Sequence, residues 1–325
     1  MEMPMELIDS LRGVVEANLA LLTPIEHAWQ PTDFLPDLEA DDWSDRLGRF
    51  RGSARALPED LLVVLVGNMV TEEALPNYSV SLEQVARDPT GVGDDPWARW
   101  LRGWTAEENR HGDLLNAYLR LTGRVDMRSV ERTVHHLIRG GFASRNRTSG
   151  VSGLIYAAFQ ERATRITHGN VGKLADGCGE ENLSRICRKI AGDEARHETF
   201  YTRVVARAME LDPEESVLAF RELLKGLAAM PGSRMFDGKD PDLFDHFAVT
   251  AQRVGAYTAQ AYGQIIGHLI EAWGVAHRSL SGKAAKAQDY LCRQSERYDL
   301  FAAEITEKLA KQPLVAFDWI HGGRA

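Results

Sequence analysis

Two short segments of this chain repeat the same pair of potential metal ligands, and this repeat constrains the fold more than any other feature. Residues 108–111 read Glu-Asn-Arg-His and residues 194–197 read Glu-Ala-Arg-His. On an α-helix, residues three apart lie on one face, so each segment directs a carboxylate and an imidazole toward a common point. One Glu-x-x-His match is weak evidence, but two in one chain favour a metal site built on helices.

A lone glutamate precedes each motif at nearly the same distance. Glu72 lies 36 residues before Glu108, and Glu161 lies 33 residues before Glu194. Each gap is about the length of an antiparallel helix pair with its turn, so the ligand pattern forms an internal two-fold repeat. Ferritin-like di-iron proteins take one Glu from each of two bundle helices and a Glu-x-x-His from each of the other two. The sequence therefore predicts an all-α fold with a ferritin-like four-helix bundle core and additional flanking helices. The six expected metal ligands, which are also the catalytic residues, are Glu72, Glu108, His111, Glu161, Glu194 and His197.

Charge and neighbouring residues support this interpretation. Four buried carboxylates without partners would each cost several kcal/mol or become protonated, whereas two ferrous ions balance their charge. Oxygen and nitrogen donors without thiolate suit iron or manganese better than structural zinc. A single Glu-x-x-His usually lies on a solvated helix surface. Here Trp104 and Leu115 flank Glu108 at helical spacing, and Glu194 has apolar neighbours of the same kind, which favours burial.

Helical periodicity dominates the rest of the chain, and strand alternation is nearly absent. Trp29–Pro36 contains two prolines and is expected to be a connector. The expected helices are a short one between Pro4 and Pro24, residues 61–85 with a kink at Pro76, 97–121, 126–138, 154–174, 181–209, one that starts at Asp212, and helical stretches over 243–273 and 281–309. Gly140 and Gly141 with the polar run 144–150 should break the chain, and Gly177 and Gly179 should mark a turn.

The chain has no linker that would divide it. We expect one domain over residues 1–325, with an N-terminal helix and connector (1–55), a ligand-bearing bundle (56–210) and flanking C-terminal helices (211–325).

Composition excludes several function classes. The longest apolar run, 61–66, is far shorter than the roughly 20 residues that cross a bilayer, so membrane insertion is not expected. A net charge of -9 disfavours nucleic-acid binding. The three cysteines form no Cys-x-x-Cys pair, and the first residues do not read as a signal or transit segment. A cytoplasmic location is expected.

The predicted ligands lie within longer motifs that resemble the soluble acyl-[acyl carrier protein] (ACP) desaturases, the plant stearoyl-ACP desaturase family and its bacterial relatives. The motifs are Thr-Glu-Glu-Ala-Leu-Pro at 71–76, Trp-Thr-Ala-Glu-Glu-Asn-Arg-His-Gly at 104–112, Phe-Gln-Glu-Arg-Ala-Thr at 159–164 and Asp-Glu-x-Arg-His-Glu-Thr at 193–199. Weaker signatures occur at 29–36, 245–253, 286–292 and 317–320. The similarity covers nearly the whole chain.

The resemblance implies that Glu108 and Glu194 bridge two iron ions per chain, cycling between Fe2+ and Fe3+. Glu72 and Glu161 would each hold one iron, and the two histidines would complete the set. It also implies that the enzyme inserts a cis double bond into a saturated acyl chain on ACP, with O2 and two electrons from a ferredoxin-type donor. A homodimer is expected, as in that family.

Further roles are expected for residues around the metal ligands. Metal-bound histidines usually donate their other N–H to a carboxylate or carbonyl, which Asp193 could accept. Trp29 is expected either on an electron route from the surface or as a packed loop aromatic. Thr71 and Thr164 are also expected beside the metal ligands. Matches to the family's pocket segments suggest a substrate channel lined at its far end by Val85, Gly153 and Leu154, with ordinary core packing as the alternative. Asn68 replaces an acid of the family.

An acidic carrier such as ACP requires a local basic patch on a chain of charge -9. Two candidates are residues 46–55, with Arg46, Arg49, Arg51 and Arg55, and the pair Arg293 and Arg297. The alternative functions are a non-catalytic iron- or carrier-binding protein of the same fold, or another ferritin-like di-iron oxidase. A ribonucleotide reductase small subunit is disfavoured, because Glu72 replaces its usual first Asp ligand.

Overall fold

The computed structural model describes residues 5–142, 150–225, 230–313 and 315–321, and within these ranges the chain is built from helices. The only β-type pairing among them is an isolated bridge between Val125 and Ile320. The helices are α1 (Met5–Ser10), α2 (Arg12–Asn18), α3 (Trp43–Ala54), α4 (Glu59–Glu73), α5 (Leu75–Ala86), α6 (Pro96–Thr122), α7 (Met127–Gly140), α8 (Gly150–Gly177), α9 (Glu181–Leu211), α10 (Pro213–Leu224), α11 (Leu243–Val254), α12 (Ala259–Ala272), α13 (Gly282–Cys292) and α14 (Gln294–Ala310), with 3-10 turns at Leu19–Leu21, Ile25–His27, Pro31–Asp33 and Val275–His277.

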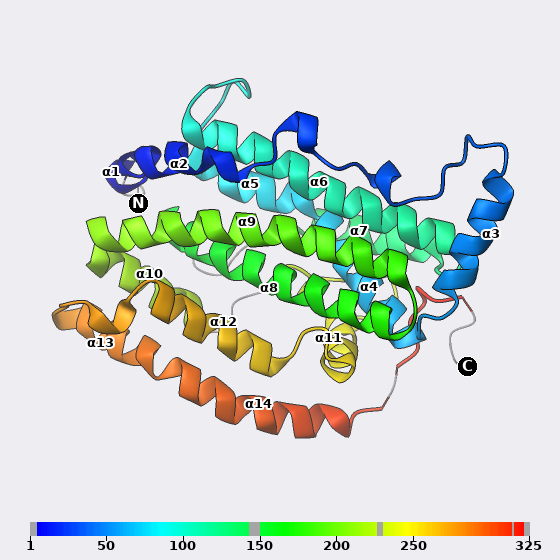
Figure 1. The fold of residues 1–325 in the computed structure, drawn as a ribbon. Helices are drawn as coiled ribbons and strands as arrows, with labels where there is room; N and C mark the ends of the chain where they lie inside the picture. Colours follow the sequence, from blue (N-terminus) through cyan, green and yellow to red (C-terminus); the bar gives the residue numbers. More distant parts are fainter. Residues whose placement is uncertain (1–4, 143–149, 226–229, 314, 322–325) are drawn as a thin grey trace.

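Four long helices form the bundle core: α8 packs along α9, α4 packs along α6, and α6 contacts α9. Figure 1 shows α9 and α8 running side by side across the molecule, with α6 above them and α12 and α14 below. Two clusters of buried apolar side chains fill the spaces between these layers. The predicted ferritin-like bundle with flanking helices is confirmed.

Local sequence signals set the bounds of α6, which carries the first Glu-x-x-His motif. The Asp95 carboxylate caps the helix by accepting from the Trp97 backbone N–H, and Pro96 occupies the first turn, where its missing N–H costs nothing. Gly123 ends the helix with a φ of 66°, a left-handed conformation that suits glycine. The predicted helix over 97–121 therefore matches α6 to within a residue at each end.

The predicted helix over 61–85 is two helices rather than one kinked helix. α4 ends at Glu73 and α5 starts at Leu75, with Pro76 in the first turn of α5. A proline inside a continuous helix would clash with the carbonyl four residues earlier, whereas in a first turn it is tolerated. The Tyr78 hydroxyl donates to the Thr71 carbonyl across the break.

Other differences from the predicted elements are two further helix breaks and one additional helix. Gly255 ends α11 with a φ of 75°, so the stretch 243–273 contains two helices. The stretch 281–309 is likewise divided into α13 and α14. α3 follows the connector expected at 29–36 and is a helix that the sequence does not predict within the segment 1–55. α8 begins at Gly150, and most of the polar run 144–150 lies outside the described residues.

Close packing of α4 on α6 depends on Gly112. A Cβ at this position would lie 3.2 Å from the Glu73 Cγ and 3.4 Å from the Glu73 backbone nitrogen. The helix that carries Glu108 and His111 therefore comes close to the end of α4, which carries Glu72. Of the helices described, none combines the length and apolar character needed to span a membrane.

Candidate metal centre

The six predicted ligands meet in the middle of the bundle. Glu72 comes from α4, Glu161 from α8, and the two Glu-x-x-His motifs from α6 and α9. All six residues are buried, and both histidines have no exposed surface. They form two groups of four, in each of which the potential ligand atoms lie within 4.8 Å of one another.

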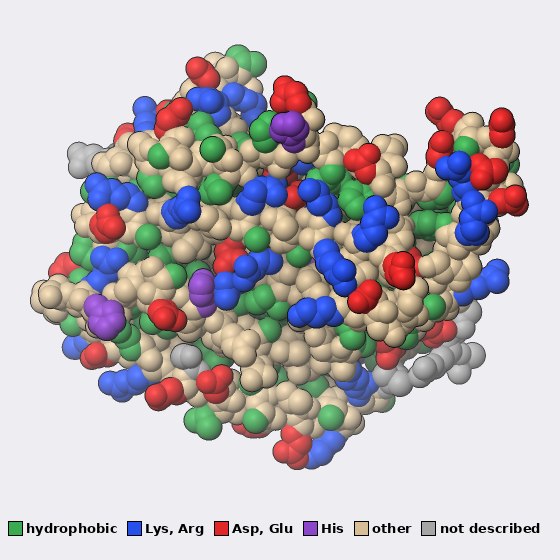
Figure 2. All heavy atoms as spheres, viewed as in Figure 1, with side chains coloured by type: hydrophobic (Ala, Val, Ile, Leu, Met, Phe, Trp, Pro, Cys, Tyr) green, Lys and Arg blue, Asp and Glu red, His purple; other side chains and the backbone are tan. Residues whose placement is uncertain are grey.

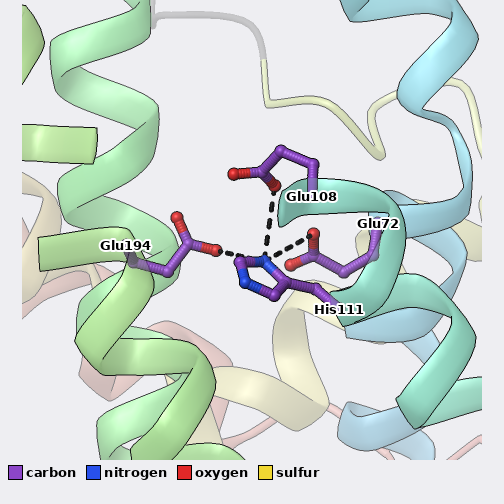
Figure 3. A group of neighbouring side chains, drawn as sticks. All are labelled: Glu72, Glu108, His111 and Glu194. Atoms are coloured by element: carbon purple, nitrogen blue, oxygen red, sulfur yellow. Dashed lines mark ion pairs between the residues drawn. The ribbon is translucent and has the colours of Figure 1, made fainter. Parts of the chain in front are cut away.

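The first group surrounds His111. Its Nδ1 lies 3.5 Å from a Glu108 oxygen, 3.4 Å from a Glu194 oxygen and 4.0 Å from a Glu72 oxygen. Figure 3 shows the three carboxylates directed at this nitrogen from three different helices. The group thus offers three oxygens and one nitrogen to a single point.

The second group surrounds His197. Its Nδ1 lies 2.7 Å from Glu108 Oε1 and 3.4 Å from Glu161 Oε2, and Glu194 completes the group. Glu108 and Glu194 therefore belong to both groups, whereas each of the other four residues belongs to one. The two groups could therefore hold metal ions at two adjacent positions that share two carboxylates.

Unpartnered atoms at the centre test whether metal ions fit. Glu108 Oε1, His111 Nδ1, Glu194 Oε1 and His197 Nδ1 are buried and have no hydrogen-bond partner. The short approach of His197 Nδ1 to Glu108 Oε1 lacks the angles of a hydrogen bond. Buried polar atoms are nearly always paired. Four unpaired oxygen and nitrogen atoms that can act as metal ligands therefore fit a pair of divalent iron or manganese ions.

Asp193 holds the outer side of His111. Its Oδ2 lies 3.4 Å from His111 Nε2 and accepts a hydrogen bond of 2.7 Å from the Trp29 indole N–H. The Trp29 ring is also stacked on the His111 ring, with centroids 6.1 Å apart and planes at 4°. Asp193 and Trp29, both expected near the ligands, thus contact the same histidine.

Glu107 does the same for His197, although it is not among the residues expected from the sequence. The His197 Nε2 lies 2.8 Å from Glu107 Oε2. The signal was present, because an acid immediately precedes the glutamate of each motif: Glu107 before Glu108, and Asp193 before Glu194. Each of these acids serves the histidine of the other motif.

Arg196 joins the two outer carboxylates. Its guanidinium lies 2.9 Å from an oxygen of Asp193 and 2.9 Å from an oxygen of Glu107. It also donates to the Leu21 carbonyl and to the Thr23 hydroxyl. One side chain therefore fixes the N-terminal segment against the groups that orient both histidines.

The two unshared glutamates have partners of their own. The Glu72 Oε1 lies 2.9 Å from His168 Nε2, and Glu161 Oε1 accepts from the Trp104 indole at 3.0 Å. His168 was not singled out from the sequence, although it follows Glu161 by two helical turns on α8 and so shares its face.

Burial and mutual charge shift the pKa values of these groups. Burial opposes protonation of His111, but the carboxylates around it, with Glu108 the strongest, raise its pKa well above 6.5. Burial also opposes protonation of His197, but the carboxylates around it, with Glu107 the strongest, raise its pKa well above 6.5. Burial raises the pKa of Glu161 well above its ordinary value and also raises that of Glu72. A centre without metal therefore retains protons that cations would displace.

The hydroxyls of Thr71 and Thr164 donate to backbone carbonyls. The Thr71 hydroxyl donates to the Asn68 carbonyl, and the Thr164 hydroxyl donates to the carbonyls of Gln160 and Glu161. Both residues line a cavity next to the ligands.

This cavity, of about 440 Å³, opens beside the cluster. Its wall includes all four ligand glutamates and is otherwise mostly apolar and aromatic. Of the three residues expected at its far end, Val85 and Gly153 line it, whereas Leu154 is fully buried in the surrounding core and is not in the wall. Asn68 also lines the cavity, and its Nδ2 has no hydrogen-bond partner.

Comparison with known proteins links this geometry to a family. The family described as "Fatty acid desaturase" matches residues 3–321. The chain is 48% identical over 320 residues to stearoyl-[acyl-carrier-protein] 9-desaturase, chloroplastic, of Gossypium hirsutum, covering 97% of this chain and 81% of that protein. It is 46% identical over 325 residues to stearoyl-[acyl-carrier-protein] 9-desaturase 1, chloroplastic, of Arabidopsis thaliana, covering 98% and 82%. The X-ray structure of DesA2 from Mycobacterium tuberculosis matches with a TM-score of 0.52 at 23% identity, covering 87% of this chain and 99% of that one, and has the same fold.

Proposed function

The chain belongs to the fatty acid desaturase family, and we propose on that basis that it is an acyl-ACP desaturase, an O2-dependent oxidoreductase that inserts a cis double bond into a saturated acyl chain carried by ACP. The relatives named above are stearoyl-ACP 9-desaturases, so stearoyl-ACP is the first substrate to test.

The observation that carries the proposal is the continuity between the carboxylate cluster and the apolar cavity. Glu72, Glu108, Glu161 and Glu194 form part of the same wall as Leu82, Val85 and several aromatic rings. A hydrocarbon chain in this cavity would lie against the cluster with most water displaced. A site for a polar substrate would not combine four acids with an apolar wall in this way.

In this proposal two irons per chain occupy the two groups. Glu72 and His111 hold one, Glu161 and His197 hold the other, and Glu108 and Glu194 contribute to both. When bound, the iron pair supplies the O2-dependent redox chemistry, because an unactivated C–H bond has no acidic proton for a side chain to take.

The chain's own residues orient and shield this centre. Asp193 and Glu107 hold the outer nitrogens of the histidines, which fixes the rings with Nδ1 facing inward. His168 and Trp104 fix one oxygen each of Glu72 and Glu161. The apolar wall positions the acyl chain and limits the access of water.

Electrons are proposed to enter beside Trp29, from an acidic ferredoxin-type donor. The Arg110 guanidinium lies 5.3 Å from the centre of the Trp29 ring, and Arg185 lies over Phe34, which packs edge-on against Trp29. Figure 2 shows Lys and Arg side chains along the face formed by α9. This basic face supports docking of an acidic donor despite the net charge of -9.

The carrier is proposed to dock near the start of α14. The Arg297 guanidinium lies over the ring of Phe301, 6.0 Å from its centre, and Phe301 lines the cavity. In the other candidate cluster, Arg46 and Arg49 are paired with Asp42. Figure 2 shows acidic and basic side chains mixed on the projection formed by α3. These observations favour Arg293 and Arg297 over the cluster at 46–55.

A homodimer and a cytoplasmic location complete the proposal. Large apolar side chains are exposed on α14 and α5, with Leu300 at 76% and Val80 at 67%, and a second copy could cover them. Cys178, Cys187 and Cys292 are free thiols, which fits a reducing compartment.

The test is a product assay with stearoyl-ACP and other acyl chain lengths, ferredoxin, ferredoxin reductase and O2, followed by analysis of the fatty acids. Iron-loaded protein should form a monounsaturated product, and protein stripped of iron should form none. Absence of any double bond across the chain lengths, with iron fully loaded, would favour the non-catalytic carrier-binding alternative.

A further inference from the structure

Three tryptophans of α6 form a line from the metal centre to the surface. Trp97, Trp100 and Trp104 are spaced by three and four residues, so they lie on one face of the helix. All three are at least 95% buried. They account for three of the seven tryptophans of the chain.

Ring contacts join the three tryptophans through His197 and Phe200. The His197 ring centre lies 6.5 Å from Trp104 and 6.2 Å from Trp100. Trp100 is stacked on Phe200 with centres 3.3 Å apart, and Phe200 is 6.3 Å from Trp97. No distance between the centres of neighbouring rings in this series exceeds the 6.5 Å between His197 and Trp104.

The line ends at a second, polar hollow. Trp97 lines a cavity of about 270 Å³ together with Arg12, Arg87 and Asp88. Part of its wall is exposed, since Asp94 has 95% of its side-chain surface accessible. A small soluble molecule can therefore come close to the outermost indole of the line.

We propose that Trp104, Trp100 and Trp97 supply electrons to the metal centre when O2 reacts there without an acyl chain. This inference rests on the proposed function. It differs from the route beside Trp29, which lies at His111 and not at His197. Its function would be to protect the ligands from oxidation.

Electron balance shows why such a supply is needed. Reduction of O2 to two water molecules takes four electrons and four protons. In desaturation the reduced iron pair provides two electrons, the two C–H bonds that break provide two electrons and two protons, and solvent supplies the other two protons. Without an acyl chain, two electrons are missing.

Indole side chains can provide these electrons because they are readily oxidised. A tryptophan that takes oxygen from one water molecule to become hydroxytryptophan releases two electrons and two protons, and solvent supplies the other two protons. Two molecules of a one-electron reductant in the polar hollow, such as ascorbate, would instead supply one electron each and leave Trp97 intact.

The experiment compares chemically reduced, iron-loaded protein exposed to O2 with and without stearoyl-ACP. Oxidised tryptophans are located by peptide mass spectrometry, and indole radicals are sought by freeze-quench electron paramagnetic resonance. We expect oxidation mainly at Trp97 and Trp100 without acyl-ACP, and its suppression by acyl-ACP or ascorbate. Trp319 is buried beside Thr133 and Phe317, and Trp43 is 48% exposed, so they serve as internal controls that should stay unmodified.

Two variants separate this route from alternatives. Trp97→Phe removes the oxidisable ring and should move oxidation inward to Trp100 and Trp104, whereas Trp97→Tyr should retain protection. Both should keep the wild-type rate with acyl-ACP and ferredoxin. Equal oxidation of Trp43 would indicate diffusing peroxide, and slower desaturation in Trp97→Phe would indicate a donor route; either result would overturn the proposal.

The product assay separates this inference from the proposed function. Desaturation without tryptophan oxidation would reject the electron line alone. Oxidation of Trp97 and Trp100 in iron-loaded protein that forms no unsaturated product would support the line and reject the desaturase. Iron-free protein should show neither.

Discussion

Asp193 on α9 and His111 on α6 face each other across the bundle, with Oδ2 3.4 Å from Nε2. The reverse contact joins Glu107 on α6 to His197 on α9. Each histidine is thus oriented by the helix that carries the other Glu-x-x-His motif, so neither metal position is assembled by one half of the repeat alone.

Removing a shared carboxylate should disrupt both metal positions. In Glu108→Ala we expect loss of the paired-iron signal, because this carboxylate belongs to both groups. Elemental analysis and Mössbauer spectroscopy of protein loaded with ferrous iron measure the result, with about two irons per chain expected in the wild type. Glu73→Gln is the matched control, since Glu73 bonds to Asn116 outside the cluster. Retention of a paired signal in Glu108→Ala would contradict the shared role.

Replacing either carboxylate that contacts an outer histidine nitrogen should weaken one metal position, whereas replacing Arg196, which contacts both carboxylates, should weaken both positions. Asp193→Asn should weaken the position at His111, and Glu107→Gln the one at His197, each by about 10- to 100-fold in metal affinity. Arg196→Lys should weaken both, because a single ammonium cannot reproduce the forked contacts of the guanidinium. Metal titration with Mössbauer detection resolves the two positions. An effect of Arg196→Lys on only one of them would show that the carboxylates are held independently.

Bulk at Gly153 should shorten the preferred acyl chain. A Cβ at this position would have no neighbour within 4 Å, and the residue lines the cavity. In Gly153→Leu the added side chain should occupy space that the end of the acyl chain would use. Product analysis over a series of acyl-ACPs measures the shift.

Leu154→Ala is the control for this prediction. It should cost about 2–5 kcal/mol of unfolding free energy through the cavity it creates, without a change in chain-length preference. Identical product distributions for Gly153→Leu and the wild type would remove Gly153 from the channel.

The metal-free protein should lose stability as pH rises through neutrality. The folded-state pKa values of His111, His197, Glu72 and Glu161 are raised, so the folded state binds more protons than the unfolded chain. Stability then falls as pH rises above about pH 4, where unfolded glutamates lose their protons before the folded ones do, and the histidines add to the fall above their ordinary pKa. Thermal unfolding at a series of pH values measures the slope. Iron-loaded protein should show a flatter dependence, and equal slopes for both forms would contradict the assignment.

Carrier docking at the start of α14 should depend on salt. KM for acyl-ACP should rise steeply with ionic strength while kcat stays nearly constant, because screening affects encounter and not the buried centre. Arg297→Gln should raise KM at low salt and reduce this dependence, whereas Arg49→Gln, on α3, should not. A KM that is indifferent to salt between about one-third and three times physiological ionic strength would mean that the carrier is held by apolar contacts.

The sequence was sufficient to predict the fold class and to select the residues that meet at the centre. Helical periodicity and the repeated ligand spacing are local patterns, and both survive in the structure because the ligands lie on continuous helices. Asp193 was singled out because it adjoins a ligand, whereas Glu107 occupies the equivalent position in the other motif and was overlooked.

Other features depended on information that lies outside local sequence. Leu154 and Gly153 are adjacent on α8, and the rotation of about 100° between successive helical residues directs Leu154 into the core and leaves Gly153 at the cavity. The choice between them is set by the packing of α5, α12 and α14, which no local pattern specifies. The two-helix form of residues 59–86 arose because Pro76 favours a new first turn over a kink.

Because of the break between α4 and α5, the four backbone segments that carry the ligand glutamates are not equally restrained. Glu108, Glu161 and Glu194 lie many residues from the ends of their helices, where backbone hydrogen bonds hold them on both sides, whereas Glu72 is one residue from the end of α4. Helix ends fray more readily than helix middles. The backbone that carries Glu72 is therefore the least restrained of the four ligand segments, although His168 holds the carboxylate itself, and amide exchange around residues 72–75 should be the fastest of the four.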